Sequence, residues 1–236
     1  MRLCVRLSLM YVMCHCLLTC SLCTALAIVS LGTDHGLHAG QFNLGPCKRQ
    51  PYEFDLRIPT MIAGPGVSPG RLPAVAGIPD LAPTILDLAG GAAASAASPT
   101  RDGRSLAPLL LAGQSRAPAV PAAPAWRDAY LIEYYATGSN AAGDVSKHLK
   151  DNANNTFVGL KVVNETMDQV YFEFTDWTRD WAFERANFCE WYDLETDPHQ
   201  LTNLCALPAN GSMAVQKAAL RAQLYEQYHC AGDSCH

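Results

Sequence analysis

The sequence predicts an α/β fold in which the end of a strand-and-helix domain precedes a small antiparallel α+β subdomain. Two observations lead to this prediction. A short apolar segment at 58–63 stops at the Gly-Pro-Gly of 64–66 and is followed by a helical apolar pattern at 80–89. Farther along, several aromatic and β-branched segments precede one helical pattern.

The first part of the chain has clear boundaries. Asp80 is placed to cap the start of the helix at 80–89, and Gly90 lies just past its end. The stretches 91–99 and 112–125 are rich in Ala and Pro, so we expect exposed loops there. The second stretch marks a subdomain boundary, which divides the chain into 28–118 and 126–236.

The second part predicts an antiparallel sheet closed by a helix. The segments 129–135, 156–163 and 169–174 are rich in aromatic and β-branched residues and are expected to be strands. Apolar residues recur at helical intervals over 212–228, so this segment is expected to pack on the sheet as the closing helix.

Composition and charge restrict the classes of function. Hydrophobic residues make up 49% of the 236 residues and charged residues 17%, which is typical of globular protein rather than a disordered tail. The formal net charge is −5. This acidic balance argues against nucleic acid or an anionic membrane as a partner.

The N-terminal segment 1–27 has the composition of a secretory signal. Arg2 and Arg6 form a basic start, the run 7–31 has no formal charge apart from His15, and Ala-Leu-Ala at 25–27 resembles a cleavage site. Two alternatives remain open, namely a membrane anchor and a wrongly assigned gene start. Contact with a membrane is expected only if the segment is not cleaved.

Cysteines and sequons indicate an oxidising destination. Cys230 and Cys235 are expected to form a small disulfide loop, with a metal site as the alternative because histidines flank it. Three sequons offer glycosylation sites at Asn154, Asn164 and Asn210. Together these features predict a secreted glycoprotein that is extracellular or lysosome-like.

The triplet Asp34-His35-Gly36 follows an apolar run and carries the first candidate chemistry. A carboxylate and an imidazole at the end of a strand lie where open α/β sheets keep their sites. Gly36 would let the chain turn sharply there. Standing alone, the triplet is more typical of a turn, and the pair does not select one metal.

The flanking residues change this interpretation. The runs TDHGLHAGQF at 33–42 and KRQPYEFDLRIP at 48–59 stand in order, and DGRSL at 102–106 and YDLETDP at 192–198 follow. This pattern resembles the sulfatase family of the alkaline-phosphatase superfamily, in the branch of N-acetylglucosamine-6-sulfatases and arylsulfatases. The resemblance covers about 28–236. It implies the C-terminal fragment of an alkaline-phosphatase-like sulfatase fold, followed by the antiparallel subdomain.

The resemblance also implies roles for individual residues. Asp34 and His35 match two ligands of the family's cation site, usually Ca²⁺. Lys48 matches the catalytic lysine that contacts the sulfate, where an ammonium suits an ester oxygen that gains negative charge. The substrate class implied is a sulfated sugar or an aryl sulfate ester.

The residues around these candidates suggest binding or structural roles. His38 is a candidate for substrate binding, with a structural histidine as the alternative. Glu53 and Arg57 are expected to form a structural ion pair or cap. Leu37 stands where the branch often has Tyr, and Cys47 where Asp is common, so the substrate preference is open.

The family's nucleophile has no counterpart in this sequence. Sulfatases convert the Cys of Cys-x-Pro-x-Arg to formylglycine, and none of the ten cysteines begins that pattern. We therefore expect a truncated product that does not hydrolyse sulfate esters by itself. The alternative is a secreted, non-catalytic glycoprotein that binds sulfated glycans or assists another protein. A membrane-anchored accessory protein and a related phosphodiesterase are further possibilities.

Overall fold

The computed structural model describes most of the chain from Val29 onward: residues 29–44, 48–72, 74–90, 101–111, 126–136, 155–175, 182–208 and 210–235. The predicted signal or anchor at 1–27 and the loops at 91–99 and 112–125 lie outside these ranges. No helix in the described ranges is long and apolar enough to cross a bilayer.

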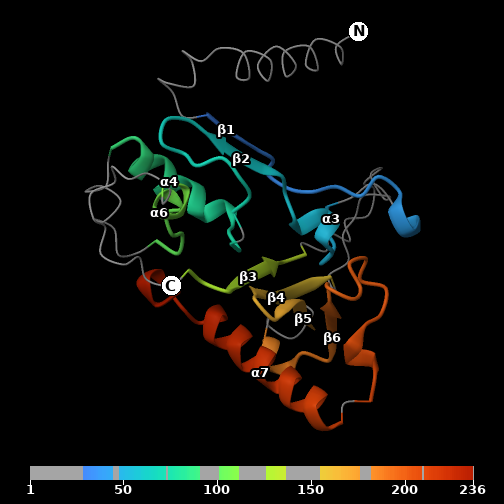
Figure 1. Cartoon of the computed structure of the whole chain (residues 1–236). Helices are drawn as coiled ribbons and strands as arrows, with labels where there is room; N and C mark the ends of the chain where they lie inside the picture. The colour runs from blue at the N-terminus through green and yellow to red at the C-terminus, as the bar shows by residue number, and fades with distance from the viewer. Residues whose placement is uncertain are drawn as a thin grey trace, which may run out of the picture.

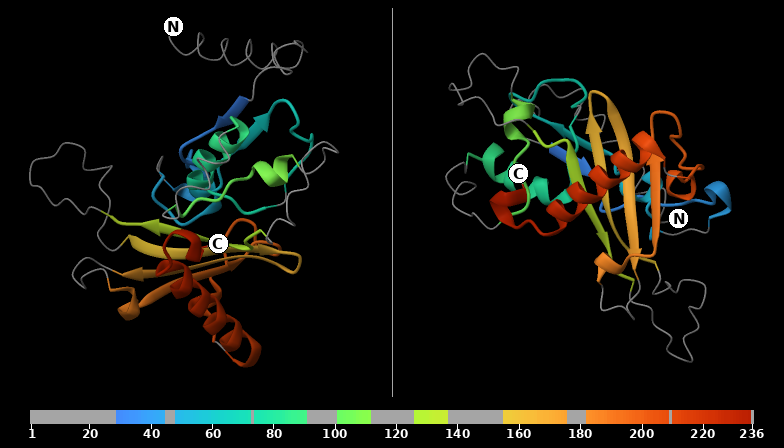
Figure 2. Two further views of the ribbon diagram at one scale, coloured as in Figure 1. Left: turned by 90° about the vertical axis from the view of Figure 1, so that its left-hand side faces the viewer. Right: turned by 90° about the horizontal axis from the view of Figure 1, so that it is seen from below.

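The described elements form three layers (Figures 1 and 2). The first layer holds the two-stranded sheet β1–β2 with three short helices, the second is the four-stranded sheet β3–β4–β5–β6, and the third is helix α7. In chain order the main elements are β1 (Val29–Gly32), α3 (Glu53–Leu56), β2 (Thr60–Ala63), α4 (Leu81–Leu88), α6 (Ala107–Leu110), β3 (Ala129–Tyr134), β4 (Thr156–Asn164), β5 (Met167–Thr175), β6 (Phe188–Asp193) and α7 (Gly211–Tyr228). Short 3₁₀ turns complete the order at η1 (Gln41–Asn43), η2 (Ile78–Asp80), η5 (Phe183–Arg185), η6 (Leu204–Ala206) and η7 (Gly232–Cys235).

The four-stranded sheet is antiparallel throughout, as the sequence predicted for its first three strands. Side chains alternate between its faces, because successive residues of a strand point to opposite sides. On β4, Phe157 belongs to one core cluster, and Val158 and Leu160 to the other. Both faces of the sheet are therefore covered.

Helix α7 covers one face of this sheet and confirms the predicted closing helix. Leu220 and Leu224 are buried in the cluster that contains Val158 and Leu160. Burying each leucine contributes roughly 1.5–3 kcal/mol. The opposite face receives Tyr52 and Leu56, so α3 docks the first layer onto the sheet.

Helix α4 confirms the predicted helix, but the role expected for Asp80 was wrong. Asp80 precedes the helix without making a side-chain cap hydrogen bond to it. Its carboxylate is fully buried, accepts hydrogen bonds from Gly77 N at 2.8 Å and Arg104 N at 2.7 Å, and pairs with Arg127. It therefore ties the loops before and after α4 to β3. Gly90, with φ of 84°, lies just past the end of the helix as expected.

The strands β1 and β2 were predicted, and their mutual orientation was not. They pair antiparallel, with Leu31 opposite Met61 and Ser30 opposite Ile62. The sequence also missed β6, the fourth strand of the larger sheet.

Candidate functional site

The predicted metal-binding segment follows directly after β1. Gly36 N donates to Asp55 O at 2.8 Å, and Leu37 N donates to Phe54 O at 3.0 Å. A Cβ atom on Gly36 would lie 1.8 Å from Phe54 O, so only glycine fits this approach. Residue 36 therefore needs glycine for a close backbone contact, and its φ is not in the left-handed region.

His38 continues this contact in the core of the first layer. Its side chain is fully buried, and Nδ1 lies 3.1 Å from Asp55 Oδ1. Asp55 Oδ2 also accepts a hydrogen bond from Gln50 N at 2.8 Å. Burial raises the pKa of the Asp55 carboxyl, while the Gln50 N–H and the neighbouring His38 and His35 side chains oppose that rise. This burial favours the structural role for His38 over contact with a substrate.

The other predicted site residues lie at the surface. The Asp34 side chain is 85% exposed, His35 is half-buried, and the closest contact between them is 3.5 Å from Nε2 to Oδ1. Lys48 is exposed. Within the described ranges, no group of three or more His, Cys, Asp or Glu residues is arranged to hold a metal ion.

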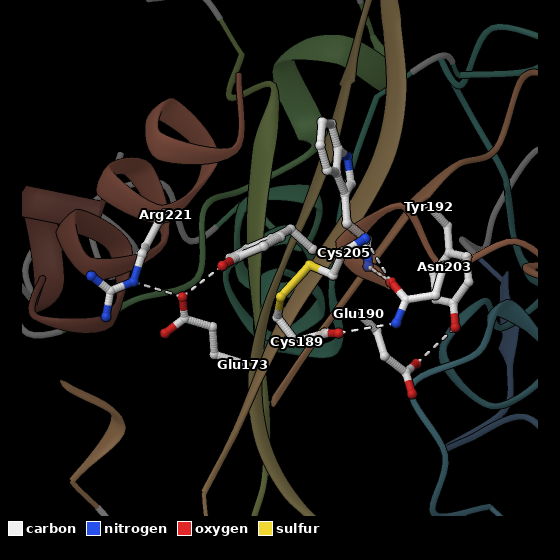
Figure 3. The surroundings of a disulfide bond; sticks show 9 residues. Glu173, Cys189, Glu190, Tyr192, Asn203, Cys205 and Arg221 are labelled. Carbon is white, nitrogen blue, oxygen red and sulfur yellow. Dashed lines mark hydrogen bonds and ion pairs between the residues drawn. A yellow bond between two sulfur atoms is a disulfide. The ribbon is translucent and has the colours of Figure 1, made fainter. Parts of the chain in front are cut away.

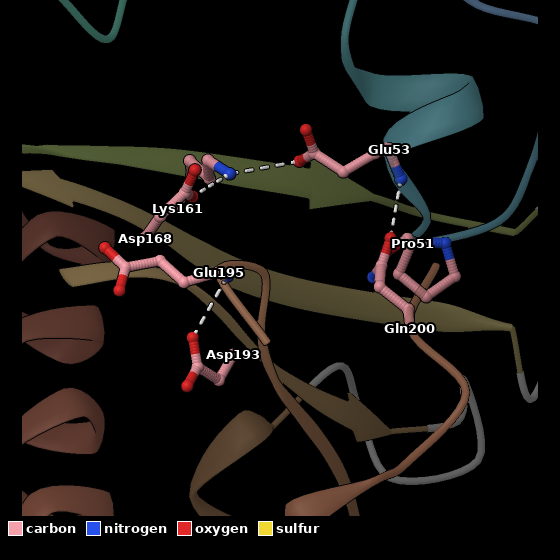
Figure 4. A network of polar contacts seen from close by, with 7 residues as sticks. All are labelled: Pro51, Glu53, Lys161, Asp168, Asp193, Glu195 and Gln200. Atoms are coloured by element: carbon pink, nitrogen blue, oxygen red, sulfur yellow. Dashed lines mark hydrogen bonds and ion pairs between the residues drawn. The ribbon is translucent and has the colours of Figure 1, made fainter. Parts of the chain in front are cut away.

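The segment around Lys48 is held by two residues from the second part of the chain, which sequence reasoning missed. Gln200 accepts a hydrogen bond from Glu53 N at 2.8 Å and donates one to Pro51 O at 3.1 Å. Figure 4 shows its carboxamide reaching the start of α3. Asn155, just before β4, donates to Arg49 O at 2.7 Å. The backbone of 49–53 is thus fastened to the sheet subdomain.

An ion-pair network strengthens the same junction. Lys161 on β4 contacts Glu53 at 3.3 Å and Asp168 at 2.6 Å (Figure 4). Glu53 is therefore structural, as expected, but Lys161 is its partner rather than the predicted Arg57. The contacts that Glu53 makes with Lys161 and Gln200 span more than a hundred positions, so local pattern does not predict them.

Two disulfides and one buried network stabilise the sheet subdomain. Cys230 and Cys235 are bonded at an S–S distance of 2.04 Å, and a second disulfide joins Cys189 to Cys205. Beside the latter, the buried Glu173 carboxylate accepts a hydrogen bond from Arg221 Nε at 2.7 Å (Figure 3). This contact ties α7 to β5, and its two residues lie 48 positions apart, so local pattern does not predict it.

Two of the three sequon asparagines lie within the described residues. Asn164 is exposed at the turn between β4 and β5, and its Oδ1 accepts hydrogen bonds from Thr166 N at 3.0 Å and Thr166 Oγ1 at 3.1 Å. Asn210 is exposed immediately before α7. Asn154 lies outside the described residues. Glycosylation therefore stays a prediction at all three positions.

Sequence comparisons give a consistent set of relatives, although no family model matches the chain. The chain is 34% identical over 187 residues to N-acetylglucosamine-6-sulfatase from Bos taurus, covering 73% of this chain and 30% of that protein. It is 30% identical over 207 residues to an arylsulfatase from Volvox carteri, covering 86% and 29%. Against an extracellular sulfatase homologue from Drosophila melanogaster, identity is 44% over 106 residues, covering 43% and 8%. The chain spans less than a third of the length of these curated relatives.

Solved structures extend the same likeness to the fold. A protein crystallised with its substrate D-glucosamine-2-N,6-O-disulfate matches with a TM-score of 0.57 at 22% identity, over 85% of this chain and 34% of that one. A 2-O glycosaminoglycan sulfatase matches with a TM-score of 0.51 at 20% identity, over 88% and 40%. The predicted fold class, an α/β C-terminal fragment followed by an antiparallel subdomain, is confirmed.

Proposed function

Because this chain belongs to the sulfatase family and corresponds to the C-terminal portion of its relatives, we propose that it supplies part of a sulfuric ester hydrolase site. One observation carries the proposal. The segment with Asp34 and His35 is pinned through Gly36 and His38 to the segment that follows Lys48. A rigid junction between these segments suits residues that must act on one ligand.

Asp34 and His35 are proposed as the ligands that this chain contributes to a divalent cation, Ca²⁺ by family resemblance. The exposed carboxylate of Asp34 is a suitable oxygen donor, and His35 is its direct neighbour. Calcium takes six to eight ligands, so two donors fit only part of a shell. A bound cation would offset the negative charge that develops on the sulfate and its attacking group.

Lys48 is proposed as the residue that contacts the sulfate group. Its exposed ammonium is a compact charge that can approach an anionic oxygen. The carbonyl of the next residue, Arg49, is held by Asn155, and that of Pro51 by Gln200. These hydrogen bonds orient the backbone on which Lys48 stands, so the lysine is presented from a fixed support.

We propose that the chain does not hydrolyse sulfate esters by itself. The reason is chemical, because none of its ten cysteines begins the Cys-x-Pro-x-Arg sequence in which the family's formylglycine is made. Removing the nucleophile of an enzyme removes most of its rate enhancement. Hydrolysis would then require the remaining portion of a sulfatase.

The proposed substrate class is a sulfated sugar or an aryl sulfate. The names of the relatives point to these two classes, and the matched structure with a sulfated glucosamine favours the sugar. The proposed destination is extracellular. An extracellular relative, the two disulfides and the exposed sequon at Asn164 support it.

A chimaera tests this function. Residues 28–236 would replace the matched C-terminal region of the bovine N-acetylglucosamine-6-sulfatase, and release of sulfate from N-acetylglucosamine 6-sulfate and 4-nitrophenyl sulfate would be measured. We expect the chimaera to be active, the chain alone to be inactive, and Lys48→Ala to lower kcat by roughly 100-fold or more. Asp34→Ala is expected to weaken calcium binding as measured by calorimetry.

The matched control is Lys217→Ala, which removes a lysine from α7 and is expected to leave kcat unchanged. A folded chimaera that keeps full activity with Lys48→Ala would refute the assigned role. Hydrolysis by the unmodified chain alone would refute the claim that its nucleophile must come from elsewhere. Tight binding of sulfated glycans by an inactive chain and an inactive chimaera would favour the non-catalytic alternative.

A further inference from the structure

A cavity of about 220 Å³ lies along β3, where three separate segments of the chain meet. One wall is β3 itself, which stands at one end of the strand order of its sheet. Pro79 of η2 and Asp102 of the loop before α6 form the second wall. The end of α7 and the disulfide-bonded turn η7 form the third, beside the start of β3 (Figure 1). None of the residues proposed above as ligands of the cation or of the sulfate lines this cavity.

Two glycines let the walls of the cavity approach each other closely. A Cβ atom on Gly103 would lie 2.1 Å from Pro79 O, so the loop that carries Asp102 packs directly on η2. A Cβ atom on Gly77 would lie 1.9 Å from Tyr130 Oη, so the phenol of Tyr130 packs on the backbone of residue 77. Walls that are fixed before a ligand arrives reduce the entropy that binding costs.

Two carboxylates on these walls are each oriented by one internal donor. Asp102 Oδ1 accepts a hydrogen bond from Gly232 N at 2.8 Å, and Glu133 Oε1 accepts one from Tyr135 Oη at 3.0 Å. Both acidic residues are exposed. Within the described ranges, the second oxygen of each carboxylate accepts no hydrogen bond. Each carboxylate therefore keeps an oxygen with which to accept from a ligand.

Donors line the same cavity. Arg127 pairs with Asp80, and its side chain is only 9% exposed. Its buried Nε donates no hydrogen bond within the described part of the chain. Since a buried N–H without an acceptor is rare in folded proteins, an oxygen of a bound ligand would satisfy it. Burial, with the nearby charge of Asp80, raises the pKa of Tyr130 to about 12, so its phenol stays protonated at neutral pH.

Aromatic rings complete the lining and restrict the ligand. Tyr130 and Tyr228 both line the cavity, and Tyr228 Oη lies 3.4 Å from the Tyr135 Oη that orients Glu133. The charge of Arg127 is offset by Asp80, so the two remaining carboxylates disfavour an anionic ligand. Sites for drug-sized ligands measure about 300–1,000 Å³, so this smaller cavity suits a ligand of one ring. Hydroxyl groups match its mixture of acceptors and donors, because each hydroxyl both donates and accepts.

From these groups we propose that the cavity binds one uncharged sugar residue. Its hydroxyls donate to Asp102 and Glu133, and the C–H face of its ring packs on Tyr228. A sulfated residue is disfavoured here, because its charge would face two carboxylates. The site goes beyond the proposed function, since it requires neither the cation nor Lys48.

Titration of the full ¹⁵N-labelled chain with N-acetylglucosamine, followed by NMR, tests the inference. The Gly232 amide donates to Asp102, so its chemical shift reports on ligand in the cavity. We expect a saturable shift with a Kd of about 1 mM. N-acetylglucosamine 6-sulfate should shift this amide with a Kd at least about ten-fold higher.

Two isosteric variants test the carboxylates separately. Asp102→Asn and Glu133→Gln each keep an oxygen for the internal donor and remove the negative charge. Each should weaken binding of the sugar roughly five-fold, because hydrogen bonds to a charged acceptor are about twice as strong as neutral ones. The matched control is Glu195→Gln, which changes an exposed carboxylate that does not line the cavity and should leave the Kd unchanged. Circular dichroism would verify that each variant is folded.

A Gly232 amide that does not respond to the sugar would overturn the inference, as would an unchanged Kd in both folded variants. Saturable binding of cyclohexylammonium without binding of the sugar would also overturn it, because the site would then select an organic cation. Binding of the sugar together with an inactive chimaera supports this site and counts against the proposed function. An active chimaera and no binding of the sugar give the reverse result.

Discussion

Truncating Gln200 gives the sharpest test of how the Lys48 segment is held. Gln200 is buried, and its carboxamide joins the sheet subdomain to Glu53 N and Pro51 O at 2.8 and 3.1 Å. Each hydrogen bond contributes about 0.5–1.5 kcal/mol net, and a buried group left without its partner adds to the loss. We expect Gln200→Ala to lower the free energy of unfolding by about 2–3 kcal/mol.

The backbone at this position supplies an internal comparison. Gln200 has φ of 55°, in the left-handed region that favours glycine. Gln200→Gly loses the same two hydrogen bonds but relieves the backbone, so it should be less destabilising than Gln200→Ala by up to about 1 kcal/mol. The difference between the two variants separates the backbone contribution from that of the side chain.

Urea denaturation followed by tryptophan fluorescence would measure both variants, since Trp191 is buried in the core. Hydrogen exchange at Glu53 N would report the local loss of protection. The exposed neighbour Leu201→Ala serves as control and should change stability by less than about 0.5 kcal/mol. A Gln200→Ala variant as stable as this control, with Glu53 N still protected, would refute the reasoning.

Three further predictions concern the sheet subdomain. Leu224 is fully buried beneath α7, so Leu224→Ala should lower the free energy of unfolding by about 2–5 kcal/mol in urea denaturation, and a loss below about 1 kcal/mol would contradict the packing. Burial raises the pKa of Glu190 above its ordinary 4.5, so its contribution to stability is fully present below pH 4.5 and is lost as the pH rises through the folded pKa. Glu190→Gln should therefore gain stability over the wild type on going from acid to neutral pH, and a constant difference in unfolding curves would count against that shift. Asn164→Gln should remove one glycan from secreted protein by mass spectrometry, and an unchanged mass would show that Asn164 is unmodified.

Local pattern predicted most of the second part of the chain. The strands β3, β4 and β5 and the helix α7 begin and end within two residues of the expected positions. Their signals are strong because aromatic and β-branched residues gather in the strands and apolar residues recur at helical spacing. Strand β6 was missed, because its Cys189, Glu190 and Asp193 interrupt the apolar alternation that marks a strand.

The candidate site was predictable only in part. The order of motifs pointed to Asp34, His35 and Lys48 by family resemblance, and Gly36 carried a signal for a special backbone position. The sequence had no signal for the pairing of His38 with Asp55. Their contact depends on how two loops approach, and loop approach follows from packing rather than from local preference.

By itself the sequence determined the family, the order of the elements and the residues that carry the candidate chemistry, because local propensity and motif order act along the chain. Only the tertiary structure decided which residues support that chemistry and which surfaces stay open. Gln200 reaches Pro51 across 149 positions, and the buried His38 lies 3.1 Å from Asp55. Both are products of long-range packing, in which distant segments meet because together they bury what neither buries alone.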